Sequence, residues 1–362
     1  MKTAIFLGAG ASAAEGAPIQ SRLFSEYFQN HNATNRSGNY DMFEKVRKFF
    51  SDMFDIDVSQ DVENLDRVNF PTFEEVLSTL DLASQRKEAF SFMSGIDVSS
   101  RSGVLEQTRL AIILLMAKII RDRLVNVNAR HSQLICHLKE SIDLRQIYFI
   151  STNYDIVIDN ALMNAFGGQE INYGIEFIGD YKTDSAIAYN PNGIELYKIH
   201  GSLNWLYCPS CNVLWHTSKF KGVMDLVEAM EGNSLRGKCR RCNNTMSPII
   251  VPPTYYKDFN SIYLSTIWSK MEKALLETNH IIFCSYSFPD SDVHIKYILK
   301  RAQKNRLNGS RLKVSVVNHY DGKNENHSKQ EKEQYERYLG SQVNYTELDF
   351  QHFANDPQSL IH

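Results

Sequence analysis

The sequence has little excess charge of either sign, few cysteines and no long apolar run. With 39 basic and 42 acidic residues, the formal net charge is −3, so no general attraction draws the chain to nucleic acid. No stretch reaches ~18 consecutive apolar residues, and we therefore expect no contact with a membrane. Six cysteines among 362 residues do not suggest the framework of a disulfide-rich secreted protein.

The amino-terminal residues do not resemble a secretion signal, because their apolar run is brief and passes directly into a glycine turn. We therefore expect a cytoplasmic protein. The composition, with 43% hydrophobic and 22% charged residues, is ordinary for a globular chain.

Short apolar stretches alternate with helical ones, which predicts an α/β protein with a parallel, doubly wound sheet. The long segment 20–145 is mostly helical and separates two strand motifs, so we interpret it as a helical insertion. Residues 200–245 carry the cysteine pairs and form a predicted small module. The sheet domain then consists of residues 1–20, 145–200 and 245–362.

The first apolar run ends in Gly8-Ala9-Gly10-Ala11-Ser12, and a helix-compatible stretch follows. Glycines between a strand and a helix let a ligand approach the backbone, and free N–H groups at a helix start favour a pyrophosphate. This predicts a dinucleotide site. The full G-x-G-x-x-G fingerprint is not present, because residue 13 is Ala, and an ordinary tight turn is the alternative.

Polar residues also follow the later strands. Asn153 and Asp155 come after the second strand, and His200 follows another. Each has an ordinary explanation, since Asn153 could cap a helix, Asp155 could stabilise a first helical turn and His200 could lie in a turn. Ligands of open parallel sheets bind beyond the carboxyl ends of the strands, so the joint placement of these residues predicts one site.

Two C-x-x-C pairs, Cys208 with Cys211 and Cys239 with Cys242, have the spacing of a tetrahedral zinc site. Four thiolates close the coordination sphere, which predicts a structural Zn²⁺ rather than a catalytic one. Three basic residues beside these cysteines leave direct contact with nucleic acid as a less favoured alternative.

The order of these motifs resembles that of the sirtuins. The glycine turn, Thr152-Asn153-Tyr154-Asp155, His200-Gly201-Ser202, the cysteine pairs, Ser285-Tyr286-Ser287 and a late Asn318 follow one another as in that family. The resemblance covers roughly residues 4 to 318. It implies a Rossmann-like NAD-binding domain with a small zinc-binding module, and NAD bound in the cleft between them.

The resemblance also implies roles for single residues. Asn153, Asp155 and His200 are expected to be catalytic: the first two contact the nicotinamide ribose and amide, and the histidine is a base toward a ribose hydroxyl. The glycine turn is expected to hold the pyrophosphate, and a serine of the later motif and Asn318 to contact the adenosine half. The expected NAD-binding set is Gly8, Ala9, Gly10, Ser12, Thr152, Asn153, Asp155, Gly201, Ser285, Ser287 and Asn318.

The chain departs from the deacetylating sirtuins at three places. Their Gly-Ile-Pro-Asp-Phe-Arg is replaced by Gly16-Ala17-Pro18-Ile19-Gln20-Ser21-Arg22. Their Phe-Gly-Glu is replaced by Val251-Pro252-Pro253, and a Gly of the later motif by Ser285. These departures weaken the expectation of deacylation more than they weaken the expectation of NAD binding.

The pattern looks like that of divergent bacterial sirtuin-like proteins, which are typically NAD hydrolases in anti-phage defence. The resemblance therefore implies hydrolysis of NAD to nicotinamide and ADP-ribose, in a homo-oligomer and beside a partner such as a HerA-type ATPase. The alternatives are an NAD-dependent protein deacylase or ADP-ribosyltransferase, and a sensor that binds NAD or ADP-ribose without turnover.

Overall fold

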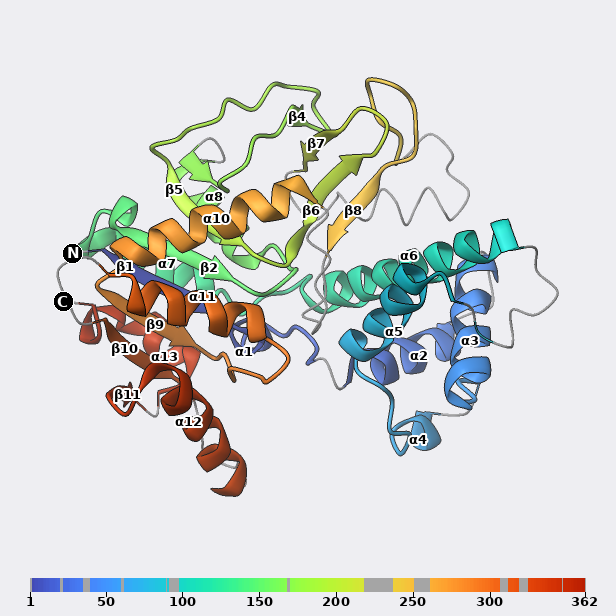
Figure 1. Ribbon diagram of the computed structural model, residues 1–362, viewed down its shortest axis with the longest axis horizontal. Coiled ribbons are helices and arrows are strands. Elements are labelled where there is room, and N and C mark those ends of the chain that lie inside the picture. Colours follow the sequence, from blue (N-terminus) through green and yellow to red (C-terminus); the bar gives the residue numbers. More distant parts are fainter. Residues whose placement is uncertain are drawn as a thin grey trace.

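The computed structural model describes residues 2–19, 22–34, 40–59, 62–88, 90, 98–167, 170–217, 237–250, 261–306, 312–318, 325–346 and 348–361. Its centre is a seven-stranded sheet of order β11-β10-β9-β1-β2-β5-β3, in which all neighbours are parallel (Figure 1). The predicted α/β fold with a parallel sheet is confirmed. The strands are β1 Thr3–Leu7, β2 Ile147–Ser151, β3 Ile171–Asn172, β5 Ile194–Lys198, β9 His280–Cys284, β10 Lys313–Val317 and β11 Val343–Tyr345.

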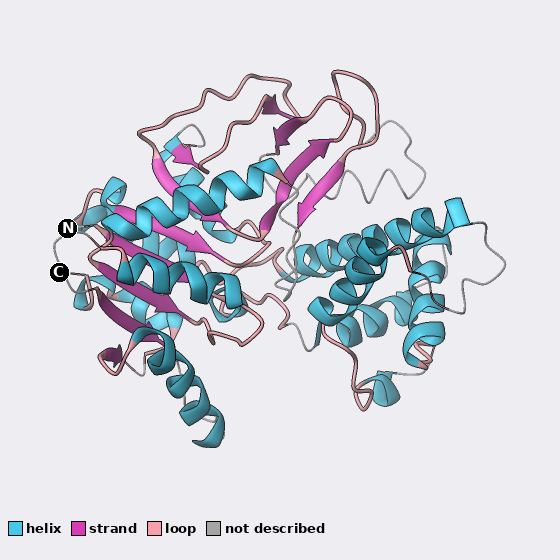
Figure 2. Ribbon diagram, in the orientation of Figure 1, coloured by secondary structure: helices cyan, strands magenta, loops and turns pink. Residues whose placement is uncertain are grey.

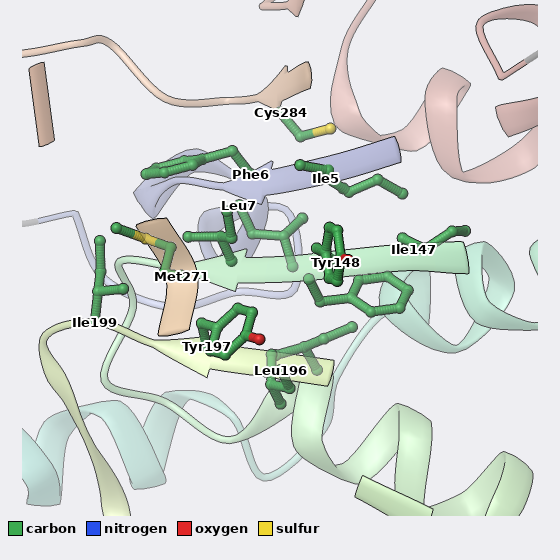
Figure 3. Packing of buried hydrophobic residues seen from close by; sticks show 14 of the residues in the cluster. Ile5, Phe6, Leu7, Ile147, Tyr148, Leu196, Tyr197, Ile199, Met271 and Cys284 are labelled. Carbon is green, nitrogen blue, oxygen red and sulfur yellow. The ribbon is translucent and has the colours of Figure 1, made fainter. Parts of the chain in front are cut away.

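Helices cover both faces of this sheet, which explains why the central strands are buried along their whole length and mostly apolar (Figure 2). All five residues of β1, β2 and β9 are buried. Figure 3 shows Ile5, Leu7, Ile147 and Leu196 packed together between the layers. One face carries α10 Ile262–Glu277, α11 Val293–Lys304 and α12 Glu325–Leu339, and the other α7 Arg130–Ser141, α8 Val157–Phe166 and α13 Phe350–Asn355.

The strand register brings the carboxyl ends of the central strands to one level. Leu7, the last residue of β1, pairs with Ser151 of β2 and with Cys284 of β9. Cys284 in turn pairs with Val317, the last residue of β10. The polar residues that follow these four strands therefore start from a common edge of the sheet.

Successive strands are added first on one side of β1 and later on its other side. From β1 the chain proceeds to β2 and β5 on one side, and later to β9, β10 and β11 on the other. The boundary between β1 and β9 is thus a topological switch point, and ligands of open parallel sheets bind beside such a point, beyond the carboxyl ends of the strands.

A separate helical unit lies to one side of the sheet (Figure 1). Its own apolar cluster includes Phe24, Phe28, Phe50 and Phe70, whose rings contact one another. The helix α7 falls within the range predicted for the insertion, yet its apolar residues pack with the sheet core. The described helices that precede α7 are α1 Ala9–Ala13, α2 Leu23–Thr34, α3 Tyr40–Phe54, α4 Val62–Leu65, α5 Phe73–Arg86 and α6 Val98–Arg123. Two short 3₁₀ turns lie elsewhere in the chain, η3 Leu144–Gln146 and η6 Pro357–Ser359.

A second, four-stranded sheet of order β4-β7-β6-β8 extends from the end of β5. Its long strand β6 starts directly after His200 and ends at the first cysteine of the metal motif. Among the described helices, none is long and apolar enough to span a membrane. The strands of this sheet are β4 Gly179–Asp180, β6 Gly201–Cys208, β7 Val213–His216 and β8 Ser247–Ile250.

Candidate functional site

The loops after β1 and β2 are joined by a cluster of side-chain hydrogen bonds. The Ser12 hydroxyl donates to Oδ2 of Asp155 over 2.5 Å, and Nδ2 of Asn153 donates to the Ser12 hydroxyl over 2.7 Å. The same Asn153 nitrogen donates to the carbonyl of Gly8 over 2.8 Å. The bonded pairs are 141 to 145 positions apart in the sequence, so two distant segments of the chain are fixed relative to one another.

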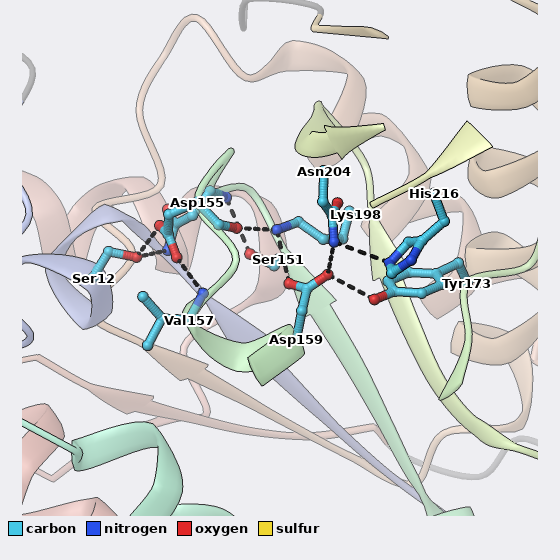
Figure 4. A network of polar contacts seen from close by, with 10 residues as sticks. Ser12, Ser151, Asp155, Val157, Asp159, Tyr173, Lys198, Asn204 and His216 are labelled. Atoms are coloured by element: carbon cyan, nitrogen blue, oxygen red, sulfur yellow. Dashed lines mark hydrogen bonds and ion pairs between the residues drawn. The ribbon is translucent and has the colours of Figure 1, made fainter. Parts of the chain in front are cut away.

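Asp155 also lies two residues before the following helix, α8. Its Oδ1 accepts a hydrogen bond from the backbone N–H of Val157 over 3.0 Å, as seen in Figure 4. A carboxylate in this position satisfies a free N–H of the first helical turn and interacts favourably with the helix dipole. Asp155 thus has the structural role that the sequence allowed, and its second oxygen contacts the glycine turn.

His200 lies at the end of β5 and is almost completely buried, with 2% of its surface exposed. Its Nδ1 lies 3.1 Å from the carbonyl oxygen of Thr152. Because a carbonyl can only accept a hydrogen bond, this contact places the proton of the neutral ring on Nδ1. Nε2 is then the basic nitrogen, and it is 4.0 Å from Oδ1 of Asp292.

Asp292 and Tyr286 extend this site, and neither was among the predicted site residues. The Tyr286 hydroxyl donates to Oδ2 of Asp292 over 2.6 Å, and both side chains are buried. Burial, followed by the charge of Asp292, raises the pKa of Tyr286 well above its ordinary value, so the phenol remains a donor. The polar residues after β9 were the sequence feature that could have identified them. Asp292, however, directly precedes helix α11, where an aspartate is expected to be an ordinary N-cap.

The glycine turn packs directly against the loop that follows β9. A Cβ added to Gly8 would lie 2.5 Å from Cα of Tyr286, and one added to Gly10 would lie 2.8 Å from Cβ of Ser285. The N–H of Gly10 donates to the carbonyl of Ser285 over 3.2 Å. Both glycines are therefore required by packing within the protein, and that N–H already has a partner.

Two further sequence features have a backbone explanation. Ser285, where the sirtuin motif has glycine, has a φ of 50°, in the left-handed region that favours glycine. Gly201 has a φ of 88°, and a Cβ there would clash with the carbonyl of Ile249 in β8. Gly201 is needed for pairing between β6 and β8, whatever its role toward a ligand.

Asn318 lies at the far end of the same edge and is buried. Its Nδ2 donates to the carbonyl of Tyr286 over 3.1 Å and to Glu331. Its Oδ1 has no hydrogen-bond partner among the described residues. A buried acceptor without a donor is costly, so this oxygen is suited to accept from a ligand hydroxyl.

The structure thus brings most of the predicted residues to one edge, although two of them face solvent. Ala9 and Ser287 are exposed, and Thr152 contributes its carbonyl to His200. The Thr152 hydroxyl lies 3.3 Å from the carbonyl of Leu7, within the protein itself.

The four cysteines of the metal motif form one cluster, in which all Sγ atoms lie within 4.8 Å of one another. A tetrahedral Zn²⁺ with Zn–S bonds of ~2.3 Å would hold its sulfurs ~3.8 Å apart, which this cluster accommodates. Each pair is followed by an asparagine with a left-handed backbone, Asn212 with a φ of 52° and Asn243 with a φ of 60°. The two matching turns direct the thiols toward a common centre, so these cysteines could hold a metal ion.

Comparison with known proteins agrees with this architecture. A family model described as the SIR2-like domain matches residues 148–343. The chain therefore belongs to the SIR2-like domain family, and the resemblance to sirtuins is confirmed at this level. The match spans Asn153, Asp155, His200 and Asp292, and begins after the glycine turn.

No curated protein shows significant sequence similarity to this chain. Solved structures do match, among them a crystal structure of Sir2 in complex with the inhibitor EX-527, 2′-O-acetyl-ADP-ribose and deacetylated p53 peptide. That chain is 13% identical, the alignment covers 99% of this chain and 93% of the other, and the TM-score is 0.39.

Proposed function

We propose that this protein is an NAD⁺ hydrolase that cleaves the bond between nicotinamide and ribose. The observation that carries the proposal is the cluster of Ser12, Asn153 and Asp155 beside a buried His200, at the switch point of a SIR2-like sheet. The unpartnered Oδ1 of Asn318 supports a ligand with hydroxyl groups at the same edge.

The reaction needs positioning more than strong catalysts. Nicotinamide is a positively charged leaving group, so its departure with the bonding electron pair leaves an oxocarbenium-like sugar, as in glycoside hydrolysis. Water then forms a bond to the same carbon and loses a proton. The products are nicotinamide, ADP-ribose and one proton, which balances the reaction without an added oxidant or reductant.

His200 is the proposed base in this step. Its Nδ1 contacts the Thr152 carbonyl, and Nε2 is the nitrogen that is proposed to accept the proton of the water or of a ribose hydroxyl. The resulting imidazolium would be stabilised by Asp292, whose Oδ1 lies 4.0 Å away.

Asn153 and Asp155 are the proposed positioning groups for substrate. The amide nitrogen of Asn153 is held by Gly8 and Ser12, which orients its Oδ1 for a ribose hydroxyl or for the attacking water. Asp155 is proposed to orient the nicotinamide amide. The Cys₄ cluster is proposed to hold a structural Zn²⁺, with no part in the chemistry.

We extend the proposal to depletion of NAD in anti-phage defence, on the basis of the sequence pattern. Uncontrolled hydrolysis of NAD would kill the host cell, so activity must be gated. Assembly into a homo-oligomer or contact with a HerA-type ATPase could supply the gate, with the helical unit as the contact surface. A chain that is monomeric and fully active alone would contradict the gating.

The test is to incubate NAD with the purified protein, without an acylated peptide, and to separate the products by liquid chromatography. We expect nicotinamide and ADP-ribose from the wild type, and a rate ~10²–10⁴ lower from Asn153→Ala and His200→Ala. Exposed Asn344→Ala and His352→Ala are the matched controls.

Each alternative gives a different result in this assay. NAD consumption that depends on an acyl-lysine peptide would identify a deacylase, and recovery of intact NAD from a stoichiometric complex would identify a sensor. Full cleavage by folded Asn153→Ala and His200→Ala proteins would refute the assignment of the site. NAD that stays intact with the peptide and with a HerA-type ATPase added would refute hydrolysis itself.

A further inference from the structure

A lysine and an aspartate form a completely buried ion pair behind the candidate site. Nζ of Lys198 lies 3.1 Å from Oδ2 of Asp159, and both side chains are 0% exposed. Lys198 is the last residue of β5, two positions before His200, and Asp159 is in the first turn of α8. The pair therefore links the strand that carries the histidine to the helix that follows Asp155.

Neutral donors complete the surroundings of the aspartate. Oδ1 of Asp159 accepts from the Tyr173 hydroxyl over 2.8 Å and from Nδ2 of Asn204 over 3.2 Å (Figure 4). The same Asn204 nitrogen lies 3.2 Å from Nε2 of His216. Burial lowers the pKa of His216, so its ring is neutral and can accept this hydrogen bond.

Lys198 has a second contact, and this one reaches the candidate site. Its Nζ donates to the backbone carbonyl of Asp155. The Asp155 side chain meets Ser12 and the N–H of Val157, so the residue is held from both sides. In Figure 4 the contacts run continuously from Ser12 through Asp155 and Lys198 to Asp159.

Stability alone does not account for this arrangement. Transferring two charges out of water costs about as much as their attraction returns, and apolar residues of similar volume often serve equally well. What an apolar residue could not supply is the hydrogen bond to the Asp155 carbonyl. The feature that distinguishes Lys198 is thus its control of the Asp155 backbone.

We propose that Lys198, neutralised by Asp159, is a positioning residue that fixes Asp155 relative to His200 for cleavage of NAD. The inference rests on the proposed function. It acts through Asp155, the proposed partner of the nicotinamide amide, so its loss affects turnover of NAD. Binding of ADP-ribose, which lacks nicotinamide, is left unchanged.

The test uses the double variant Lys198→Met/Asp159→Asn. Asn at 159 retains an oxygen for Tyr173 and Asn204, and removal of both charges leaves no buried charge unpaired. The matched control is Lys139→Met, because Nζ of Lys139 donates to the carbonyl of Ala165 at the opposite end of α8, over 3.0 Å. The single variant Lys198→Met serves as the disruptive reference.

Four quantities are measured on each protein: the melting temperature, the Kd for ADP-ribose, the kcat for NAD, and amide hydrogen exchange in residues 153–157. For the double variant we expect a near-unchanged melting temperature and ADP-ribose affinity, with kcat lower by ~10- to 100-fold. Exchange in residues 153–157 should be faster than in the wild type and in Lys139→Met.

A double variant with wild-type kcat and wild-type exchange would overturn the inference. So would a parallel loss of melting temperature, ADP-ribose binding and kcat, since that result describes a purely structural pair. If the wild type does not cleave NAD, the proposed function fails separately. The exchange measurement then decides the inference, because faster exchange in residues 153–157 alone supports positioning and unchanged exchange refutes it.

Discussion

Substitution of Gly8 by alanine tests the packing that forms the candidate site. The added Cβ would lie 2.5 Å from Cα and 2.6 Å from Cβ of Tyr286, and the first distance is roughly 1 Å inside an ordinary carbon–carbon contact. The atoms that it meets belong to the backbone or lie next to it, so no rotamer change relieves the clash. The N–H of Gly8 also donates to the Cys284 carbonyl over 2.9 Å, which prevents β1 from withdrawing.

Overpacking typically costs ~1–3 kcal/mol, and we expect Gly8→Ala to lie near the upper value of about 3 kcal/mol. At ~2–4 °C per kcal/mol, the melting temperature should fall by roughly 6–12 °C. Circular dichroism at a fixed heating rate measures this change. The control is Gly103→Ala in α6, where a Cβ meets nothing within 4 Å and helix propensity predicts a gain of ~1 kcal/mol. Equal melting temperatures for Gly8→Ala and the wild type would refute the reasoning.

Two other predictions concern the metal motif and a buried pair beside α1. The purified chain should contain one zinc per molecule, and a chelator or Cys239→Ala should lower the melting temperature. Substitution of the exposed Cys136 by alanine is the control and should leave the melting temperature unchanged. Zinc-free protein of unchanged stability would contradict this prediction. Burial opposes ionisation of Glu15, but hydrogen bonds from His131 outweigh it and hold the pKa of Glu15 below its ordinary value. Ionised Glu15 therefore stabilises the fold at pH values above its unfolded-state pKa, and this contribution is lost as pH falls through the folded-state pKa. Glu15→Gln should cost about 1–3 kcal/mol at pH 7 and progressively less in acid, measured by urea unfolding. An equal cost at all pH values would contradict a stabilising role for the ionised carboxylate.

The fold could be predicted because its signals are local. Strands buried on both faces are mostly apolar, and in β1, β2 and β9 the polar residue of each strand lies at its end. Parallel strands also need long crossover connections, which are usually helices, so the alternation of strands and helices along the chain predicted the sheet. The strand ends then placed Asn153, Asp155 and His200 at one edge without any knowledge of side-chain contacts.

The remaining residues of the candidate site depend on contacts that the sequence does not express. Asp292 precedes α11 and has the sequence features of an N-cap, yet its side chain makes no capping hydrogen bond and meets Tyr286 instead. Lys198 ends a strand, where a lysine is ordinarily exposed, but its side chain is completely buried and paired with Asp159. In both cases the position of the side chain depends on a tertiary contact, with Tyr286 for Asp292 and with Asp159 for Lys198, which the local sequence does not indicate.

The glycine turn shows why a motif and its physical role must be separated. Gly8 packs on Tyr286, the Tyr286 hydroxyl donates to Asp292, and Asp292 lies 4.0 Å from Nε2 of His200. A larger residue at position 8 would therefore displace the groups beside the proposed base, without any contact between Gly8 and a ligand. If Gly8 is needed only to let the backbone approach the pyrophosphate, Gly8→Ala raises KM for NAD and leaves the melting temperature unchanged. If packing is the main requirement, Gly8→Ala lowers the melting temperature and kcat together, and measurement of all three quantities on one preparation separates the two roles.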